Sequence, residues 1–416
     1  MPDAALRVCL ITREHPAFGP TGGIGAHTHH LARALAARGH AVTVLAHGPE
    51  GAREAGGVRL VGVGARDTWR APWPSRWLGM AARTAPFALR AARALRREGP
   101  FDVVEVPEYQ GWGLAAAALT RGPVVARLHG HTALVRRLNG QPLDADARLC
   151  GQLEAATLRR ATRVMASSGC LAEEARREFA ASLPPDRVTL VPLGIDCHHF
   201  QPGAGAPLRA RLGASPQAPV LLYVGRLEAR KGVWTLLQAF TEVVRHHREA
   251  LLVLAGGDPP AGKGLPLREA LVAEAHQAGV AAHLRLLGHV PPAELPALYA
   301  AADLFVAPST AEPFGLVYLE AMACGRAVIG CLAGGVPEIV VDGATGWLVP
   351  PQNAPALAAC IHAALADPDG LCAMGQGARR AVEARFSLEA LAARTEACYH
   401  AALAHHAATT NAGRPS

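Results

Sequence analysis

Hydrophobic residues in this chain occur in short runs separated by longer amphipathic segments. The runs RVCLIT at 7–12 and AVTVLA at 41–46 have the length of buried strands, and between them Leu31, Ala34 and Leu35 recur at helical spacing. Strand, helix and strand within about forty residues are typical of a unit with two parallel strands. Further strands are expected in the same half at 102–106, 124–129, 163–167 and 188–191.

A break in this pattern follows at 191–207, VPLGIDCHHFQPGAGAP, which is rich in proline and glycine and weakly periodic. We interpret it as a linker between two domains. The alternation then resumes, with helices expected from about 232 and 315. The strands of this second half are expected within 218–225, 249–257, 283–288, 302–309, 327–331 and 346–350. The sequence therefore predicts an α/β fold class with two doubly wound Rossmann-like domains facing a central cleft, because ligands of such sheets bind beyond the carboxyl ends of the strands.

The predicted domains are an N-terminal one at 1–195 and a second one at 196–385. A long helix at 386–406 follows the second set of strands without a strand of its own, and we expect it to pack back on the N-terminal domain. Residues 407–416 are polar and are predicted to form a flexible tail.

Composition narrows the class of protein only slightly. Half of the 416 residues are hydrophobic, so a sizeable core can form, and the net charge of +7 suits an anionic substrate, a nucleic acid or an anionic membrane equally well. The nine cysteines include no CxxC pair and lie mostly in apolar stretches, which is typical of buried thiols in a reducing compartment. With no apolar run long enough to cross a bilayer, we expect a cytoplasmic protein.

A basic turn, VGRLEARKG at 224–232, stands at the end of a predicted strand. Gly225 ends the apolar run, Arg226 follows it, and Lys231 with Gly232 opens the next helix. A guanidinium fork and a compact ammonium beside a helix N-terminus suit phosphate groups. A polar loop with solvated cations explains the same residues equally well.

The stretch EPFGLVYLE at 312–320 places two carboxylates eight positions apart. Glu312 falls in the loop after a strand, Gly315 permits a close approach of the backbone, and Glu320 lies about one and a half turns into a helix. Carboxylates commonly hold the vicinal hydroxyls of a ribose or hexose, and the amides from Gly315 to Val317 face any anion bound there. The alternative is a capping glutamate followed by one on a helix surface.

Histidines and glycines of the N-terminal half give weaker signals. His129 ends the strand VVARLH and could bind a sugar hydroxyl or shuttle a proton, although a structural role is the commoner one. Gly22 and Gly23 precede a helix in TGGIG, an incomplete dinucleotide fingerprint. In HTHH at 27–30 two histidines share a helix face without carboxylate or cysteine partners, so we expect surface histidines and no metal site.

Taken together, TGGIG, RLHGH, VPLGID, VGRLEARKG, EPFGLVYLE, EAMACGRAVIG and GGVPEIV occur in this order over nearly the whole chain. This set resembles the retaining glycosyltransferases of family four, the glycosyl transferases group 1, which have the GT-B fold. The resemblance implies transfer of a hexosyl group from a UDP- or GDP-sugar to an acceptor hydroxyl, with retention of anomeric configuration and without a metal or other cofactor. It places the acceptor on the N-terminal domain and the nucleotide sugar on the second.

The resemblance also implies a role for individual residues. Arg226 and Lys231 would bind the donor diphosphate, reached from the first domain by Gly22 and Gly23, and Glu320 would hold the ribose. The transferred sugar would contact Glu312 and the backbone of Phe314, Gly315, Leu316 and Val317, with His129 on its outer hydroxyls. Gly288 and Val290, in the turn LGHV, would offer backbone contacts to the base. The catalytic candidates are His129, Glu312, Arg226 and Lys231.

Metal binding is the alternative way to stabilise a leaving diphosphate. Asp144 and Asp146 spell the DxD pattern of metal-dependent transferases, but they lie in a polar connection of the first domain, away from the basic turn. We interpret them as the cap of a helix start and predict no metal requirement.

Acceptor and partner signals are less specific. Glu108, Tyr109 and Trp112 follow a strand and could form a platform for a polar ring, or could simply pack in the core. The acceptor class, a small molecule, a lipid or a glycan, is left open. Arginines at 76, 83, 90 and 97 form a basic stripe for which a solvated face is favoured over peripheral contact with a membrane.

Two other classes compete with the transferase. A sugar-nucleotide epimerase or a phosphorylase would use similar phosphate contacts, and a non-catalytic protein could bind the nucleotide sugar alone. Binding of nucleic acid is not expected, because the arginines are not interleaved with aromatic residues along one surface.

Overall fold

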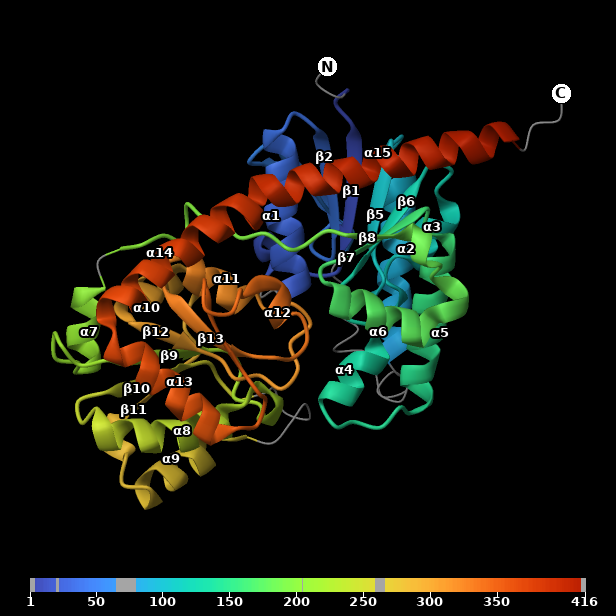
Figure 1. Cartoon of the computed structure of the whole chain (residues 1–416). Helices are drawn as coiled ribbons and strands as arrows, with labels where there is room; N and C mark the ends of the chain where they lie inside the picture. The colour runs from blue at the N-terminus through green and yellow to red at the C-terminus, as the bar shows by residue number, and fades with distance from the viewer. Residues whose placement is uncertain (1–3, 20–21, 65–79, 204, 259–265, 413–416) are drawn as a thin grey trace. The chain divides into compact units, whose positions relative to one another are not determined.

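The computed structural model describes residues 4–19, 22–64, 80–203, 205–258 and 266–412, and the chain divides into two compact units (Figure 1). Unit 1 contains the residues up to Gly194 together with the segment that begins at Leu388, and unit 2 runs from Ile195 to Ser387. Each unit is built around one sheet with helices packed on it. The predicted α/β fold class, with two domains each built on a largely parallel sheet, is confirmed.

The sheet of unit 1 has the strand order β3-β4-β2-β1-β5-β6-β7-β8. All neighbours pair in parallel except β3 and β4, which are antiparallel, and Val8 of β1 lies opposite Val42 on one side and Val103 on the other. The strands are β1 (Arg7–Thr12), β2 (Ala41–Ala46), β3 (Gly51–Ala55), β4 (Val58–Gly62), β5 (Val103–Pro107), β6 (Val124–Leu128), β7 (Arg163–Ala166) and β8 (Val188–Leu190). The direction of chain progression reverses between β1 and β5, so loops that follow these strands flank a switch point.

The helices of unit 1 cover both faces of this sheet. They are α1 (Gly23–Ala37), α2 (Met80–Glu98), α3 (Leu114–Leu119), α4 (Thr132–Leu138), α5 (Ala145–Arg160), α6 (Gly169–Phe179) and α15 (Leu388–Ala412). Apolar side chains of α1 and α15 share one core cluster with the strands, and those of α2, α3, α5 and α6 share the other. Helix α15 reaches Ala412, so residues 407–412, expected in the flexible tail, continue the helix, while 413–416 lie outside the described residues.

A buried polar cluster ties α15 to the sheet of unit 1. Arg127 of β6 is fully buried and pairs with Glu105 of β5, the Nε–Oε1 distance being 2.7 Å. From α15, the Tyr399 hydroxyl donates to the second carboxylate oxygen at 2.6 Å, and Thr395 Oγ1 accepts from the guanidinium at 3.1 Å. A helix that follows the second unit in sequence thus completes the interior of the first.

The sheet of unit 2 is entirely parallel, in the order β11-β10-β9-β12-β13-β14. Its strands are β9 (Val220–Val224), β10 (Leu251–Ala255), β11 (Leu284–Gly288), β12 (Leu304–Val306), β13 (Ala327–Cys331) and β14 (Gly346–Val349). Its helices are α7 (Ala206–Leu212), α8 (Val233–His246), α9 (Arg268–Gln277), α10 (Leu295–Ala301), α11 (Leu316–Ala323), α12 (Val336–Ile339), α13 (Ala354–Ala366) and α14 (Pro368–Arg385). Chain progression reverses between the neighbours β9 and β12, which places the loops after these two strands at the switch point.

The predicted basic stripe falls partly on α2. Arg76 lies outside the described residues, Arg90 is half-buried and Arg97 is exposed, and the Arg97 guanidinium pairs with Glu98 at 3.1 Å. Among the helices in the described part of the chain, none combines the length and apolar character needed to cross a bilayer.

Candidate active site

The switch point of unit 2 brings together the two motifs that the sequence singled out. The turn after β9 ends at Gly232, whose backbone is left-handed with φ of +72° and caps α8. A Cβ atom at this glycine would lie 2.0 Å from the carbonyl oxygen of Pro308, in the loop after β12. Only glycine allows this approach, so the basic turn packs directly on the start of the EPFGLVYLE loop.

Lys231 and Glu312 meet at this junction. The Lys231 ammonium contacts Oε2 of the Glu312 carboxylate, and the two side chains are only 16% and 13% exposed. The backbone joins the loops as well, because the Thr310 amide donates to the Arg230 carbonyl at 2.8 Å. Two of the predicted catalytic residues, 81 positions apart in sequence, are therefore direct neighbours.

Arg226 lies on the solvent side of the same turn. Its guanidinium pairs with Glu228 at 2.8 Å and is 48% exposed, while Arg230 pairs with the other oxygen of Glu228 at 2.8 Å. With Lys231 and Glu312, the cluster holds three cations and two carboxylates, one positive charge in excess. The exposed guanidinium and the excess charge suit an anionic ligand.

The start of α11 supplies backbone donors beside this cluster. Gly315 has φ of +110° and precedes the helix, and Phe314 is buried with its ring 6.3 Å from that of Phe386. As in any α-helix, the first amides, here those of Leu316 and Val317, have no carbonyl partner within their own helix and favour an anion.

The GGVPEIV motif positions Glu312, a role that sequence reasoning missed. The Gly335 amide donates to the Glu312 carbonyl at 2.8 Å. At Gly334 the backbone has φ of +62°, and a Cβ atom would lie 2.1 Å from that same carbonyl oxygen. The glycine pair was visible in the sequence, but its target, twenty-two residues upstream, was not.

Glu320 lies on α11 with its carboxylate toward α10. The Tyr299 hydroxyl donates to Glu320 Oε2 at 2.6 Å, and burial raises the pKa of Glu320 to about 7 despite this hydrogen bond. In the part of the chain that the structure describes, Oε2 accepts this hydrogen bond and Oε1 accepts none, so Oε1 can accept from another hydroxyl. This arrangement is compatible with its predicted role toward a ribose.

Gly288 is the last residue of β11, the outermost strand of the sheet and two strands away from β9, and Val290 lies in the turn that follows. Gly288 is left-handed with φ of +70°, and its carbonyl accepts from the Gly256 amide at 2.7 Å. Val290 is half-buried. The predicted backbone contacts to the base would thus come from a turn at the edge of the sheet, where the Gly288 carbonyl already accepts a hydrogen bond.

In unit 1, Glu108 is fully buried, which corrects its interpretation as part of an acceptor platform. Its carboxylate accepts from the backbone amides of His129, at 2.9 and 3.0 Å, and of Gly130, at 2.9 Å. Burial, together with the nearby Glu154, raises the pKa of Glu108 to about 8. Its function in the fold is to hold the turn that carries His129.

Trp112 also belongs to the core. It is 3% exposed, its indole N–H donates to the Gln110 side chain at 3.2 Å, and its ring meets that of Tyr109 at 5.4 Å. Packing, one of the two interpretations offered by the sequence, therefore accounts for Trp112. Tyr109 remains partly exposed, so it is the one member of the predicted platform able to reach an acceptor.

Helix α1 starts at Gly23, with Gly22 as its N-cap residue. The Gly22 amide donates to Glu14 Oε2 at 2.6 Å, so a carboxylate of the protein already occupies one of the predicted donor contacts. His27, four residues after Gly23, is buried, contrary to the surface position expected for it. The reason is its place on one face of α1 with Leu31 and Leu35, both fully buried against the sheet.

The rings of His27 and His129 are in contact, with centroids 5.6 Å apart and planes at 64°. Burial and the Arg127 guanidinium lower the pKa of both, that of His129 to about 3. His129 is therefore neutral near pH 7 and can donate a hydrogen bond from one ring nitrogen and accept one at the other.

The first aspartate of the DxD pair lies at the start of a helix. Asp144 caps α5 by accepting from the Ala147 amide at 2.8 Å, which confirms the predicted helix cap, and Asp146 lies in the first turn. Within the described ranges, no group of three or more His, Cys, Asp or Glu side chains is arranged to hold a metal ion.

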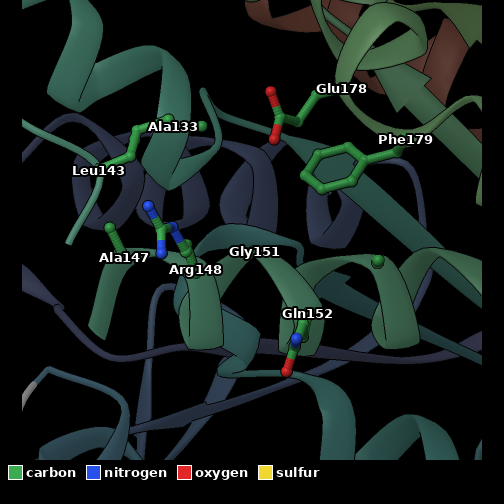
Figure 2. A pocket seen from close by; sticks show the side chains of 9 residues that line it. Ala133, Leu143, Ala147, Arg148, Gly151, Gln152, Glu178 and Phe179 are labelled. Carbon is green, nitrogen blue, oxygen red and sulfur yellow. The ribbon is translucent and has the colours of Figure 1, made fainter. Parts of the chain in front are cut away.

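A separate hollow of about 250 Å³ lies between α4, α5 and α6 (Figure 2). Figure 2 shows Arg148 of α5 and Glu178 at the end of α6 on different sides of it, with the Phe179 ring beside Glu178. The residues lining it include none of the predicted donor contacts, so it is distinct from the loops that carry them.

Comparison with known proteins agrees with this arrangement of motifs. The family described as Glycosyltransferase Family 4 matches residues 21–199, and the family described as Glycosyl transferases group 1 matches residues 206–381. The chain belongs to the group 1 glycosyltransferases of family 4 and is an enzyme with the GT-B fold.

Individual relatives are similar over nearly their full length. The D-inositol 3-phosphate glycosyltransferase of Frankia alni is 34% identical over 380 residues, 88% of this chain and 91% of that protein. The glycogen synthase of Mycobacterium tuberculosis is 30% identical over 95% of each chain. Among solved structures, the sucrose-phosphate synthase from Thermosynechococcus elongatus has a TM-score of 0.79 and 28% identity, covering 95% of this chain and 99% of that one. These names are those of transferases and synthases, so the epimerase, phosphorylase and non-catalytic alternatives gain no support from them.

Proposed function

We propose that this glycosyltransferase moves a hexosyl group from a nucleotide-diphosphate sugar, a UDP- or GDP-sugar, to an acceptor hydroxyl, with retention of configuration and without a metal. The observation that carries the proposal is the contact between Lys231 and Glu312. It puts a cation suited to phosphate beside a carboxylate suited to sugar hydroxyls, at the switch point where such sheets bind nucleotides.

In this proposal Arg226 and Lys231 bind the diphosphate, supported by the first amides of α11. Glu312 holds the transferred sugar, Glu320 holds the ribose, and neutral His129 contacts a sugar hydroxyl. The remaining predicted donor contacts are backbone ones: Gly22, Gly23, Gly288, Val290, Phe314, Gly315, Leu316 and Val317.

The chemistry requires stabilisation of a leaving group. As the bond between the anomeric carbon and the diphosphate oxygen breaks, negative charge grows on the phosphate oxygens, where fixed cations lower the barrier. Removing one such donor costs on the order of 100-fold in rate. The acceptor oxygen attacks from the face that the leaving group occupied and passes its proton to the leaving phosphate oxygen. The products are a glycoside of unchanged anomeric configuration and a nucleoside diphosphate.

In this proposal two positively charged side chains stabilise the leaving diphosphate, the task that a divalent ion performs in metal-dependent transferases. The exposed guanidinium of Arg226 and the ammonium of Lys231 support metal independence. The relatives' names point to different products, so the proposal goes no further on the acceptor than a hydroxyl group.

Calorimetric titration of the full chain with UDP, GDP and ADP, each with and without EDTA, tests the proposal. We expect one nucleotide to bind in the micromolar range with the same affinity in EDTA. Binding that disappears in EDTA would refute metal independence, and absence of binding by all three nucleotides would refute the donor class.

A further inference from the structure

His27 and His129 come from different elements of unit 1, and their rings are in contact. His27 lies one turn into α1, His129 follows β6, and their rings pack edge to face at 5.6 Å. His27 is 6% exposed, and its Nε2 is buried without a hydrogen-bond partner in the described part of the chain. Within the described residues, the aromatic contact of His27 is the one with the His129 ring.

The unpartnered nitrogen is costly in a core. A buried polar atom without a partner has given up its hydrogen bonds to water and gained none in return. Leu31 and Leu35 occupy the same face of α1 without this cost. Because an apolar residue could fill the position, the imidazole of His27 needs a further explanation.

The hydrogen bonds described above hold the backbone of His129 but not its side chain. The Glu108 carboxylate holds the His129 backbone amide, but it makes no bond to the ring. Arg127, two residues earlier on β6, is engaged by Glu105 and Thr395. The His27 ring packs against the imidazole of His129, the part of that residue that these hydrogen bonds do not hold. Because both imidazoles are neutral, they pack without charge repulsion.

We propose that His27 is a positioning residue that fixes the ring plane of His129 for its contact with the transferred sugar. The inference rests on the proposed function, in which His129 binds a sugar hydroxyl. Without the His27 ring, the His129 side chain can rotate away, and the hydrogen bond to the sugar must then offset the cost of ordering that side chain.

The readout that isolates this role is the gain in affinity that the sugar adds to the nucleotide. The full chain is titrated with the nucleoside diphosphate that it binds and with the corresponding nucleotide sugar, UDP-glucose or GDP-mannose, in EDTA. An edge-to-face ring pair contributes about 0.5–1.5 kcal/mol, so His27→Ala should reduce the sugar's gain by about two- to tenfold. Affinity for the bare nucleotide should stay within about twofold of the wild type, because its predicted contacts are on other residues.

Two further variants make the outcome specific. His27→Phe keeps a ring of similar shape and removes the unpartnered nitrogen, so it should restore the sugar's gain. His40→Ala removes an equally buried histidine, 5% exposed, that accepts from the Leu6 amide at 3.1 Å and makes no ring contact with His129. It should leave the gain unchanged.

Each failure has a distinct appearance. A wild type that binds neither nucleotide nor nucleotide sugar overturns the proposed function, and the inference with it. A wild type that binds both, with an unchanged gain in His27→Ala or a lost gain in a folded His27→Phe variant, overturns the positioning role alone.

Discussion

Replacing Glu108 probes how the protein holds its predicted sugar-binding histidine. In the structure this carboxylate has no solvent contact and accepts from the backbone amides of both His129 and Gly130. Glu108→Ala removes both acceptors without touching the histidine. Glu108→Gln retains one carbonyl oxygen, which can serve the two amides from the position of Oε1, 2.9 Å from each.

The magnitude follows from the hydrogen bonds that are lost. Each buried amide left without a partner costs about 1–3 kcal/mol, so Glu108→Ala should destabilise the turn by about 2–6 kcal/mol. The glutamine should cost on the order of 1 kcal/mol at pH 5. Its disadvantage should shrink as pH rises, because the native pKa of Glu108, about 8, lies above its ordinary value, and ionisation opposes folding between about pH 4.5 and 8.

Hydrogen exchange at the amides of His129 and Gly130 measures this turn directly. We expect Glu108→Ala to abolish most of their protection and Glu108→Gln to retain much of it, while the exposed Glu173→Ala serves as a control without effect. Protection of both amides at the wild-type level in Glu108→Ala would refute the assigned role of the carboxylate.

Three further predictions concern the glycine junction, a carboxyl group and the last helix. Gly232→Ala should abolish nucleotide binding in calorimetry, whereas Gly343→Ala, which has the same φ of +72° but nothing within 4 Å of a Cβ, should cost only backbone strain of about 1 kcal/mol. Because the native pKa of Glu320 is raised to about 7, its ionisation lowers the free energy of unfolding as pH rises from about 4.5 to 7. Glu320→Gln cannot ionise, so the decline measured by urea unfolding should be smaller in this variant by on the order of 1–3 kcal/mol. Tyr399→Phe deletes the donor to buried Glu105 and should lower thermal stability by about 1–3 kcal/mol, and an unchanged melting temperature would contradict the role given to α15.

The parts of the fold predicted from sequence are those with a strong local pattern. Strands β1, β2 and β13 lie at their expected limits because each is a continuous apolar run buried in a parallel sheet. The antiparallel pair β3 and β4 was not predicted. Strand β3 is exposed along its whole length, so its sequence, GAREA, shows no alternation of apolar and polar residues. Backbone hydrogen bonds pair it with β4, and the pattern of apolar and polar side chains gives no sign of them.

In the candidate site, too, some features had a signal in the sequence and others had none. The pairing of the basic turn with EPFGLVYLE follows from the strand order, in which β9 and β12 are neighbours, and sequence motifs alone could only suggest it. The burial of His27 had a usable signal, the spacing of four to Leu31 and eight to Leu35, which was outweighed by the polar run HTHH. The burial of Glu108 had none, because a polar residue after a strand is equally common in a loop and in a buried bond to backbone.

The most direct test of the donor site compares nucleotide binding by Arg226→Ala with that by Arg245→Ala. Arg245 is an exposed arginine of unit 2 that pairs with Glu242 on α8, so it matches the loss of charge without touching the turn. The account predicts that Arg226→Ala weakens binding of the nucleoside diphosphate at least about tenfold in EDTA, the effect of losing one charge-assisted contact of about 1.5–3 kcal/mol, while Arg245→Ala binds like the wild type. Equal affinities in the two variants would contradict a diphosphate site built on the turn after β9.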